Sequence, residues 1–408
     1  MPAENVGYGT GRQLRALVVA YTEYPWDSRV RREAETLARD GYKVHMVSLK
    51  PRVGGSPSRI RGVDLSELPL TIRRGGRLSY VYQYTAFFLM SLTTLVRLQL
   101  RHRFDLVHIH SLPDFQVFCA LPLKLRGIPI LLDLHESMPE LLRARFHLSE
   151  TATVVRLSAW LQVFSCRFAD HVIVACDGIR DVLIQRGVPA TRVTSVYNAV
   201  EEPAIHPNAI EVRHRFRLPD ARFIVHAGGI NPERDLETLL KAVAILPSNE
   251  RMHLLIAGEG VQPYVQSLQT LSARLGIAER VHFVGRLPVE DARALMAISD
   301  VGVVTLESNP HTELSWPIRV AEFVHLMKPL VVPRLRFMVE TLQDSAHFYE
   351  PGNASSLAQQ IEKVLSDSAG SASKVVQAET VCRPYEWPHM RKAMLGICQT
   401  MVSDRATD

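Results

Sequence analysis

Residues 315–333 read SWPIRVAEFVHLMKPLVVP and predict a short helix that leads directly into a buried strand. We expect Ser315 to cap the amino end of the helix and Pro317 to lie in its first turn, because serine and proline are preferred at those positions. Leu330, Val331 and Val332 are apolar and mostly β-branched, which favours a strand. A helix followed by an apolar strand is the repeating unit of α/β proteins with parallel sheets.

The same alternation extends outward from this stretch over most of the chain. In the carboxyl half, strands are predicted at 222–227, 253–257, 281–284 and 301–305, with helices at 236–246 and 262–275. In the amino half, strands are predicted at 14–20, 42–49, 106–110, 129–135 and 171–175, with a helix near 30–40. The segment EEPAIHPN at 201–208 breaks the pattern and indicates a linker. The sequence therefore predicts two doubly wound α/β domains, which fits a length of 408 residues.

The composition is that of a globular protein, with 47% hydrophobic and 22% charged residues. A net charge of +5 allows an anionic ligand or membrane surface, but no basic tail or aromatic signature indicates nucleic acid as a partner. The five cysteines are scattered without a CxxC pair, which fits a reducing cytoplasm and argues against a structural metal.

One uncharged run, YVYQYTAFFLMSLTTLV at 80–96, raises the question of a membrane. It is close to the minimum length for a spanning helix, yet it contains Gln83 and several hydroxyl side chains. We expect a partly buried helix, with peripheral contact at the inner face of the membrane as the alternative.

Two groups of residues in the carboxyl half are candidates for binding a diphosphate. Arg319 and Glu322 are three residues apart and share one helical face, near a helix amino end that attracts anions. Gly228 and Gly229 follow a predicted strand, where they allow close approach of a phosphate, and Arg234 can supply a bidentate positive charge. The alternatives are an ordinary surface ion pair on the helix and a tight turn with an exposed arginine.

The amino half contributes histidines at predicted strand ends. His108 and His110 end one strand, and His135 follows Asp133 at the end of another, where side chains can project from the carboxyl edge of the sheet. A lone histidine at such a place is usually a packing residue. Asp27 precedes a predicted helix and is either a catalytic candidate or simply its N-cap. No spacing among these residues matches a familiar metal site.

The ordered set of motifs resembles glycosyltransferase family 4 with the GT-B architecture, from about residue 14 to residue 401. The motifs are, in order, DSRVRREA (27–34), FDLVHIH (104–110), DLHE (133–136), ADHVIV (169–174), VYN (196–198), AGGINPERDLE (227–237), IAGEG (256–260), VHFVGRLP (281–288), PIRVAEF (317–323) and YEW (385–387). The resemblance implies two Rossmann-like domains that face each other across a cleft. It implies an acceptor-side domain at 1–203, a nucleotide-sugar-binding domain at 204–385 and a C-terminal helix at 386–408 that crosses back to the first domain.

Site residues carry over by position. Arg234 matches the basic residue at the donor pyrophosphate, Glu322 the ribose-binding glutamate, and His135 the histidine near the transferred sugar. Arg286 and Leu287 match the segment that lines the base pocket.

This sequence also departs from the family pattern at three places. Gly229 stands where an arginine is usual, and Met327 where a glycine is usual. The first glutamate of the family's pair falls at Leu314, with Glu313 as its neighbour, so Glu313 is the substitute candidate for the donor site.

The resemblance implies transfer of a hexosyl group, with retention, from a UDP- or GDP-sugar to a hydroxyl acceptor that is a glycan, a lipid-linked molecule or a small molecule. It implies no cofactor and no obligatory metal, and a place in polysaccharide, glycolipid or glycoside biosynthesis in the cytoplasm or at the inner membrane face. Two alternatives stay open: another GT-B enzyme such as a sugar-nucleotide epimerase, and a non-catalytic nucleotide-sugar-binding partner, suggested by the changes at Gly229, Leu314 and Met327.

Overall fold

The computed structural model describes residues 12–24, 26–51, 57–71, 77–201, 207–247 and 252–407. The chain forms two compact units, one made of residues 1–197 and 388–408 and the other of residues 198–387. The boundary expected after residue 203 and most of the predicted linker at 201–208 lie outside the described residues. No helix among the described residues combines the length and hydrophobicity needed to cross a bilayer.

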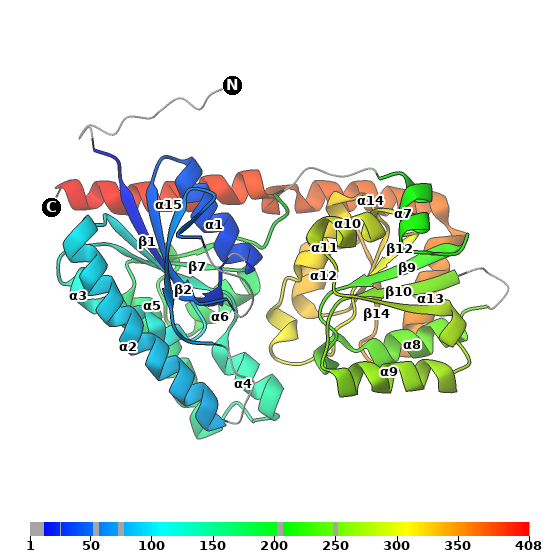
Figure 1. Cartoon of the computed structure of the whole chain (residues 1–408). Helices are drawn as coiled ribbons and strands as arrows, with labels where there is room; N and C mark the ends of the chain where they lie inside the picture. Colours follow the sequence, from blue (N-terminus) through cyan, green and yellow to red (C-terminus); the bar gives the residue numbers. More distant parts are fainter. Residues whose placement is uncertain are drawn as a thin grey trace. The chain divides into compact units, whose positions relative to one another are not determined.

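The first unit is built on an eight-stranded sheet among the residues described (Figure 1). Its strand order is β3-β4-β2-β1-β5-β6-β7-β8, and every pairing is parallel except β3 with β4. The strands are β1 (Arg15–Glu23), β2 (Lys43–Leu49), β3 (Arg59–Ile60), β4 (Val63–Leu68), β5 (Leu106–His110), β6 (Ile130–Leu134), β7 (His171–Val174) and β8 (Val193–Ser195). The central strands are buried on both faces, which is why they appear in the sequence as largely apolar runs.

Helices cover both faces of this sheet. They are α1 (Ser28–Arg39), α2 (Arg77–His102), α3 (Leu121–Lys124), α4 (Met138–Phe146), α5 (Thr153–Phe168), α6 (Asp177–Gln185) and α15 (Trp387–Thr407), with a 3₁₀ segment η1 (Asp114–Ala120) before α3. Helices α1 and α15 lie on one face, and α2, α3 and α5 lie on the other (Figure 1). This division follows from right-handed crossovers, because the chain moves one way along the sheet through α1 and the opposite way through α2, α3 and α5.

The second unit has a fully parallel sheet of six strands within the described part of the chain, in the order β11-β10-β9-β12-β13-β14. The strands are β9 (Arg222–Ala227), β10 (Met252–Ala257), β11 (Val281–Gly285), β12 (Val301–Val303), β13 (Leu330–Pro333) and β14 (His347–Tyr349). The helices are α7 (Ala209–Arg215), α8 (Leu236–Ile245), α9 (Gln262–Arg274), α10 (Val289–Ala297), α11 (Ile318–His325), α12 (Arg336–Leu342), α13 (Ala354–Ser366) and α14 (Ser368–Cys382). The strands and helices predicted here are confirmed, with ends that differ by one or two residues.

Candidate functional site

The second sheet reverses its strand order between β9 and β12. From β9 the chain proceeds through β10 to β11 on one side, and then returns to place β12, β13 and β14 on the other. Ligands of doubly wound sheets bind outside the carboxyl ends of the strands at such a switch point. The loops that follow β9 and β12 therefore mark the expected ligand site of this unit, and the first carries Gly228, Gly229 and Arg234.

The glycines around this switch point allow loops to touch. The Gly228 nitrogen donates to the carbonyl of Ala257, and the Gly258 nitrogen donates to the carbonyl of Gly285, both at 2.9 Å. A Cβ at Gly258 would lie 1.7 Å from the Gly228 oxygen, so no larger residue fits there. Gly260 is equally constrained by Ile230. The GxG at 258–260 is therefore explained by close backbone packing between the loops after β9 and β10.

Arg234 is held in place by its backbone. It ends the 3₁₀ turn η3 (Pro232–Arg234), and its carbonyl accepts a hydrogen bond from the Thr305 hydroxyl in the loop after β12. The Glu307 nitrogen also donates to the Glu233 carbonyl at 3.0 Å. These bonds tie the loops after β9 and β12 together and fix the half-buried Arg234 at the switch point.

The helix that carries Arg319 and Glu322 is α11, and its start differs from the prediction. Ser315 does not cap this helix: it ends the preceding 3₁₀ turn η5 (Thr312–Leu314), and its hydroxyl donates to the His311 carbonyl at 2.9 Å. Pro317, in an extended conformation at φ −67° and ψ 128°, is the residue before the first helical turn. The predicted cap was wrong because the serine side chain finds a local carbonyl before the helix begins.

Packing brings α11 onto the sheet. The ring of Phe323 lies so close to Gly302 in β12 that a Cβ at position 302 would be 2.5 Å from it. Arg319 and Glu322 share one face, as predicted, and the guanidinium donates to the carboxylate. Glu322 is 6% exposed, so its carboxylate is withdrawn from bulk water.

One residue of this site, His226, was not predicted. It lies near the carboxyl end of β9 and is 3% exposed, directly beneath Gly228. Burial lowers the pKa of His226 to about 3, and the positive charges of Arg234 and then Arg319 contribute to the shift. Arg234, in the loop after β9, and Arg319, in α11, therefore both contribute positive charge near the carboxyl end of β9. The signal in the sequence was a histidine within an apolar strand just before paired glycines.

The other residues predicted to bind the donor differ in their exposure and in their contacts. Arg286 is exposed after β11 and pairs with Glu259 at 3.3 Å, beside the half-buried Leu287. Gly229 is exposed. The carboxylate of Glu313 accepts hydrogen bonds from the Ser308 hydroxyl and the Arg336 nitrogen, both at 2.7 Å. Glu313 thus stabilises the start of α12, and its role at the donor remains a prediction.

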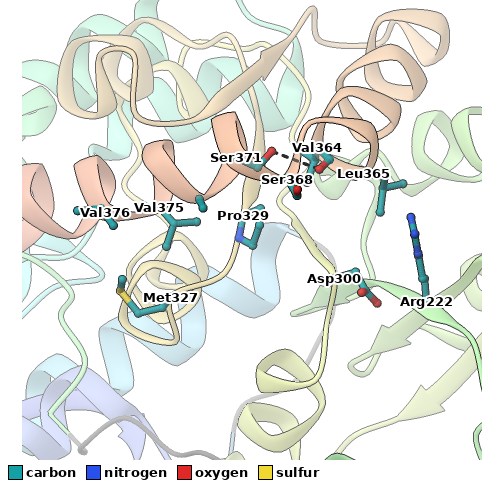
Figure 2. A pocket seen from close by; sticks show the side chains of 11 residues that line it. Arg222, Asp300, Met327, Pro329, Val364, Leu365, Ser368, Ser371, Val375 and Val376 are labelled. Atoms are coloured by element: carbon teal, nitrogen blue, oxygen red, sulfur yellow. Dashed lines mark hydrogen bonds between the residues drawn. The ribbon is translucent and has the colours of Figure 1, made fainter.

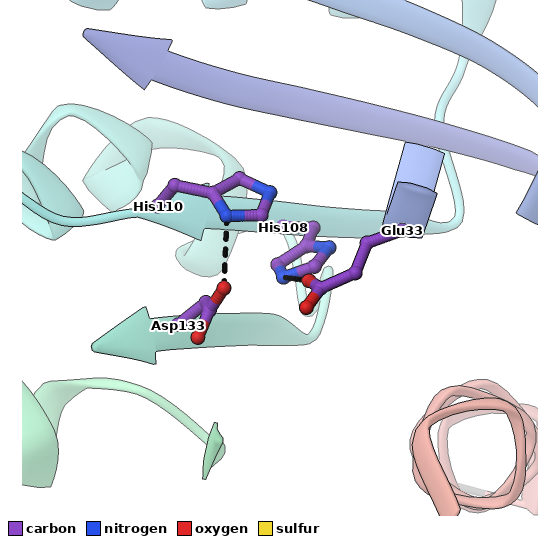
Figure 3. Close-up of side chains that lie close together, drawn as sticks. All are labelled: Glu33, His108, His110 and Asp133. Atoms are coloured by element: carbon purple, nitrogen blue, oxygen red, sulfur yellow. Dashed lines mark hydrogen bonds and ion pairs between the residues drawn. The ribbon is translucent and has the colours of Figure 1, made fainter. Parts of the chain in front are cut away.

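In the first unit, the strand-end histidines surround a buried ion pair. Arg29 donates two hydrogen bonds to Asp133, at 2.8 Å and 2.7 Å, and both residues are almost inaccessible. Their positions are 104 residues apart in the chain, in α1 and β6. The His110 Nδ1 lies 3.0 Å from the Asp133 carboxylate, as Figure 3 shows, and His108 lies 3.5 Å from Glu33. The arginine holds the pKa of Asp133 well below its ordinary value despite its burial.

Only one of the three histidines reaches the surface. His108 and His110 are at most 1% exposed, which fits the packing role that is usual for a strand-end histidine. The side chain of His135 is 21% exposed, and its Nε2 lies 3.1 Å from Asp133. This carboxylate raises the pKa of His135 against the opposing effect of burial. Asp27 caps α1 by accepting from the Arg29 and Val30 nitrogens, the alternative foreseen from the sequence.

The buried histidines and carboxylates of the first unit include residue types that bind metal ions. Potential ligand atoms of Glu33, His108, His110 and Asp133 lie within 4.8 Å of one another (Figure 3), and these residue types bind zinc. However, the guanidinium of Arg29 engages both oxygens of Asp133 and lies 3.3 Å from Glu33. A permanent cation thus already neutralises this group, and we assign no metal to it.

A separate pocket of about 510 Å³ lies in the second unit, shown in Figure 2. Arg222, Asp300 and Pro329 line it, and these residues stand at the amino ends of β9, β12 and β13. It therefore lies at the opposite edge of the sheet from Arg234. Met327, at its rim, has a φ of +55°, which explains why glycine is usual at this turn.

Comparisons with known proteins cover most of the chain. A family model described as "Glycosyl transferase 4-like domain" matches residues 27–199, and one described as "Glycosyl transferases group 1" matches residues 210–379. An alpha-D-kanosaminyltransferase of Streptomyces kanamyceticus is 23% identical over 60% of this chain, and the sulfoquinovosyl transferase SQD2 of Arabidopsis thaliana is 24% identical over 70%. These alignments span 63% and 55% of the two relatives' own lengths.

Solved structures are similar over nearly the whole chain. HepE of Anabaena, in complex with UDP and glucose, is 17% identical and superposes with a TM-score of 0.73 over 95% of this chain and 100% of that one. The sucrose-phosphate synthase of Thermosynechococcus elongatus is 17% identical, with a TM-score of 0.75 over 96% and 100%. The two parallel-sheet domains and both family matches place the chain in glycosyltransferase family 4, with the GT-B fold.

Proposed function

We propose that the protein is a glycosyltransferase that moves a hexosyl group from a nucleoside diphosphate sugar to a hydroxyl acceptor, with retention of configuration. The observation that carries this proposal is the geometry at the switch point of the second sheet. Hydrogen bonds from Thr305 and Glu307 fix the loop of Arg234 there, and α11, packed on β12, carries the Arg319–Glu322 pair. Two fixed positive charges there suit a diphosphate, which is also the leaving group of sugar transfer.

The chemistry follows from how charge moves. As the bond between the sugar and the diphosphate breaks, negative charge grows on the departing phosphate oxygens. We assign the stabilisation of that charge to Arg234, Arg319 and the amino end of α11, because fixed positive groups need no reorganisation. Because these groups supply permanent positive charge, the proposal includes no obligatory metal and no cofactor.

The rest of the donor site is proposed around these charges. Glu322 holds the ribose hydroxyls, and its low exposure strengthens such hydrogen bonds. Gly228 and Gly229 allow the phosphates to approach the backbone. Arg286 and Leu287 line the base, and Glu313 contributes near the sugar. The UDP and glucose named in the HepE complex support a UDP-sugar first, with a GDP-sugar as the alternative.

On the acceptor side we propose His135 as the residue nearest the transferred sugar, with Asp27 close by. Asp133 accepts from one nitrogen of His135 and keeps the ring oriented, while the exposed edge stays available to substrate. Relatives named as a kanosaminyltransferase and a sulfoquinovosyl transferase support sugar transfer, and we propose a polysaccharide, glycolipid or glycoside as the product. A nearby membrane would suit a lipid-linked acceptor, and we propose peripheral contact through residues 80–96 at the inner membrane face.

A two-stage experiment tests the proposal. Thermal unfolding is first followed with UDP, GDP and their sugar conjugates, because a ligand that binds only the folded state raises the midpoint. The stabilising donor is then incubated with candidate hydroxyl acceptors, and release of nucleoside diphosphate with the anomeric form of the product is measured. Free epimerised donor without an acceptor would indicate an epimerase instead. Stabilisation without turnover under any acceptor would indicate a non-catalytic partner, and no stabilisation by any nucleotide would refute the donor site.

A further inference from the structure

The layer of helices α2, α3 and α5 on the first unit has an unusual charge distribution. None of the three sequences contains an aspartate or glutamate. Exposed positive side chains are nevertheless spread over α2 and α5, namely Arg97, Arg101, Arg156 and Arg167. Among the described residues, no carboxylate lies within ion-pairing distance of Arg97, Arg101 or Arg156. Lys124 of α3 is paired with Asp170 at 2.6 Å, but the arginines leave this surface with an excess of positive charge.

The same layer exposes large apolar side chains. On α5, Leu157, Trp160 and Phe164 are 60%, 61% and 50% exposed, and their spacing of three and four residues places them on one helical face. The rings of Trp160 and Phe164 stack, with centroids 5.4 Å apart. Leu125, the residue that follows α3, is 79% exposed. Soluble monomers seldom expose aromatic and aliphatic groups together in this way.

The helices are neighbours, so these features belong to one surface. The segment η1 packs between α2 and α5. The ring centroid of its Phe118 lies 5.2 Å from that of Phe164 in α5, and the centroid of its Phe115 lies 6.1 Å from that of Phe88 in α2. A groove of about 540 Å³ runs between α2 and α3, with apolar Leu92, Val96 and Leu100 in its wall and Arg97 and Arg101 at its edge. Figure 1 shows α2, α3 and α5 on the same face of the sheet.

We propose that this surface of α2, α3 and α5 docks on a bilayer of anionic lipids, with the Leu157–Trp160–Phe164 face of α5 as the inserted apolar centre. Trp and Phe partition into the interface between headgroups and acyl chains, and the arginines meet the lipid phosphates. The absence of acidic side chains from all three helices favours this occupant over a second copy of the chain, because two such cationic surfaces would repel each other. The inference extends the peripheral contact proposed for residues 80–96 and assigns its apolar centre to α5.

Vesicle sedimentation of the full chain tests the proposal, using phosphatidylcholine alone and phosphatidylcholine with about one-third phosphatidylglycerol. We expect binding to the anionic vesicles only, weakened by high salt. The variant Leu157→Ser/Trp160→Ser should bind about tenfold more weakly, since two side chains would no longer insert. The matched control Ile210→Ser/Val376→Ser, at exposed apolar positions of the second unit, should bind like the parent.

A second variant addresses charge. Arg97→Gln/Arg101→Gln/Arg156→Gln should lose most of the salt-sensitive part of the binding. Equal binding of the Leu157→Ser/Trp160→Ser variant and the parent would overturn the proposal, as would salt-independent binding to neutral vesicles. If light scattering shows that the parent is a dimer and that Leu157→Ser/Trp160→Ser is a monomer, the surface binds a second copy of the chain instead of a bilayer. Because transfer to a water-soluble acceptor needs no vesicle, loss of vesicle binding with retained transfer separates this inference from the proposed function.

Discussion

Replacing Arg234 by alanine should weaken nucleoside diphosphate binding while leaving the fold intact. The carbonyl of Arg234 accepts from the Thr305 hydroxyl, and its nitrogen donates to the Asn231 carbonyl. Both bonds use backbone atoms of residue 234, which the substitution leaves in place. A hydrogen bond to a charged group contributes roughly 1.5–3 kcal/mol, which corresponds to about a 10- to 160-fold increase in the dissociation constant for UDP. Because Arg234 is only half-buried, we expect the lower part of that range.

The comparison of two ligands makes the test specific. Isothermal titration calorimetry with UDP and with uridine should show the loss for UDP alone, because the nucleoside carries no phosphate. Lysine at position 234 should restore part of the affinity, since the charge survives without the bidentate geometry. The variant Arg319→Ala should act on the same diphosphate, so the double change should be less than additive. Arg215→Ala, which removes an exposed arginine of α7 in the same unit, is the matched control.

A second readout is independent of any ligand. Since the charge of Arg234 contributes to the low pKa of His226, that pKa should rise in Arg234→Ala, although burial should keep it below the ordinary value. An NMR titration of the imidazole measures the change. The reasoning is refuted if UDP binds the variant as tightly as the parent, if UDP and uridine lose affinity equally, or if the His226 titration does not move.

Three further outcomes are expected. Glu322→Gln should weaken UDP binding by about 1–3 kcal/mol in calorimetry with an unchanged melting temperature, and unchanged affinity would exclude Glu322 from the site. His135→Ala should lower kcat far more than donor affinity, whereas normal turnover would make His135 a packing residue. Burial raises the pKa of Glu33 from 4.5 to about 8, so between these values the folded state binds more protons than the unfolded state. The free energy of unfolding by urea should therefore fall as pH rises through this range, and Glu33→Gln should flatten the slope; a parent slope of zero or of opposite sign contradicts this.

The sequence and the structure agree most closely where local pattern is decisive. The runs at 222–227 and 330–332 form strands because mostly apolar and β-branched residues suit a sheet buried on both faces. The prediction and the structure disagree at Ser315. Its hydroxyl can either accept from the backbone amides of the following helix or donate to the preceding His311 carbonyl, and it does the latter. Such choices depend on a single turn of backbone, which hydrophobic periodicity does not specify.

By itself the sequence determined two parallel α/β units, the family and the candidate arginines of the donor site, because apolar periodicity and ordered motifs are properties of the chain alone. The tertiary structure decided which residues meet. Arg29 reaches Asp133 across 104 positions, and the loop of Arg234 bonds to Thr305 and Glu307 only because β9 and β12 are neighbours in one sheet. Those contacts are set by strand order and by side-chain burial, and these in turn fix which histidine stays neutral and which carboxylate stays charged.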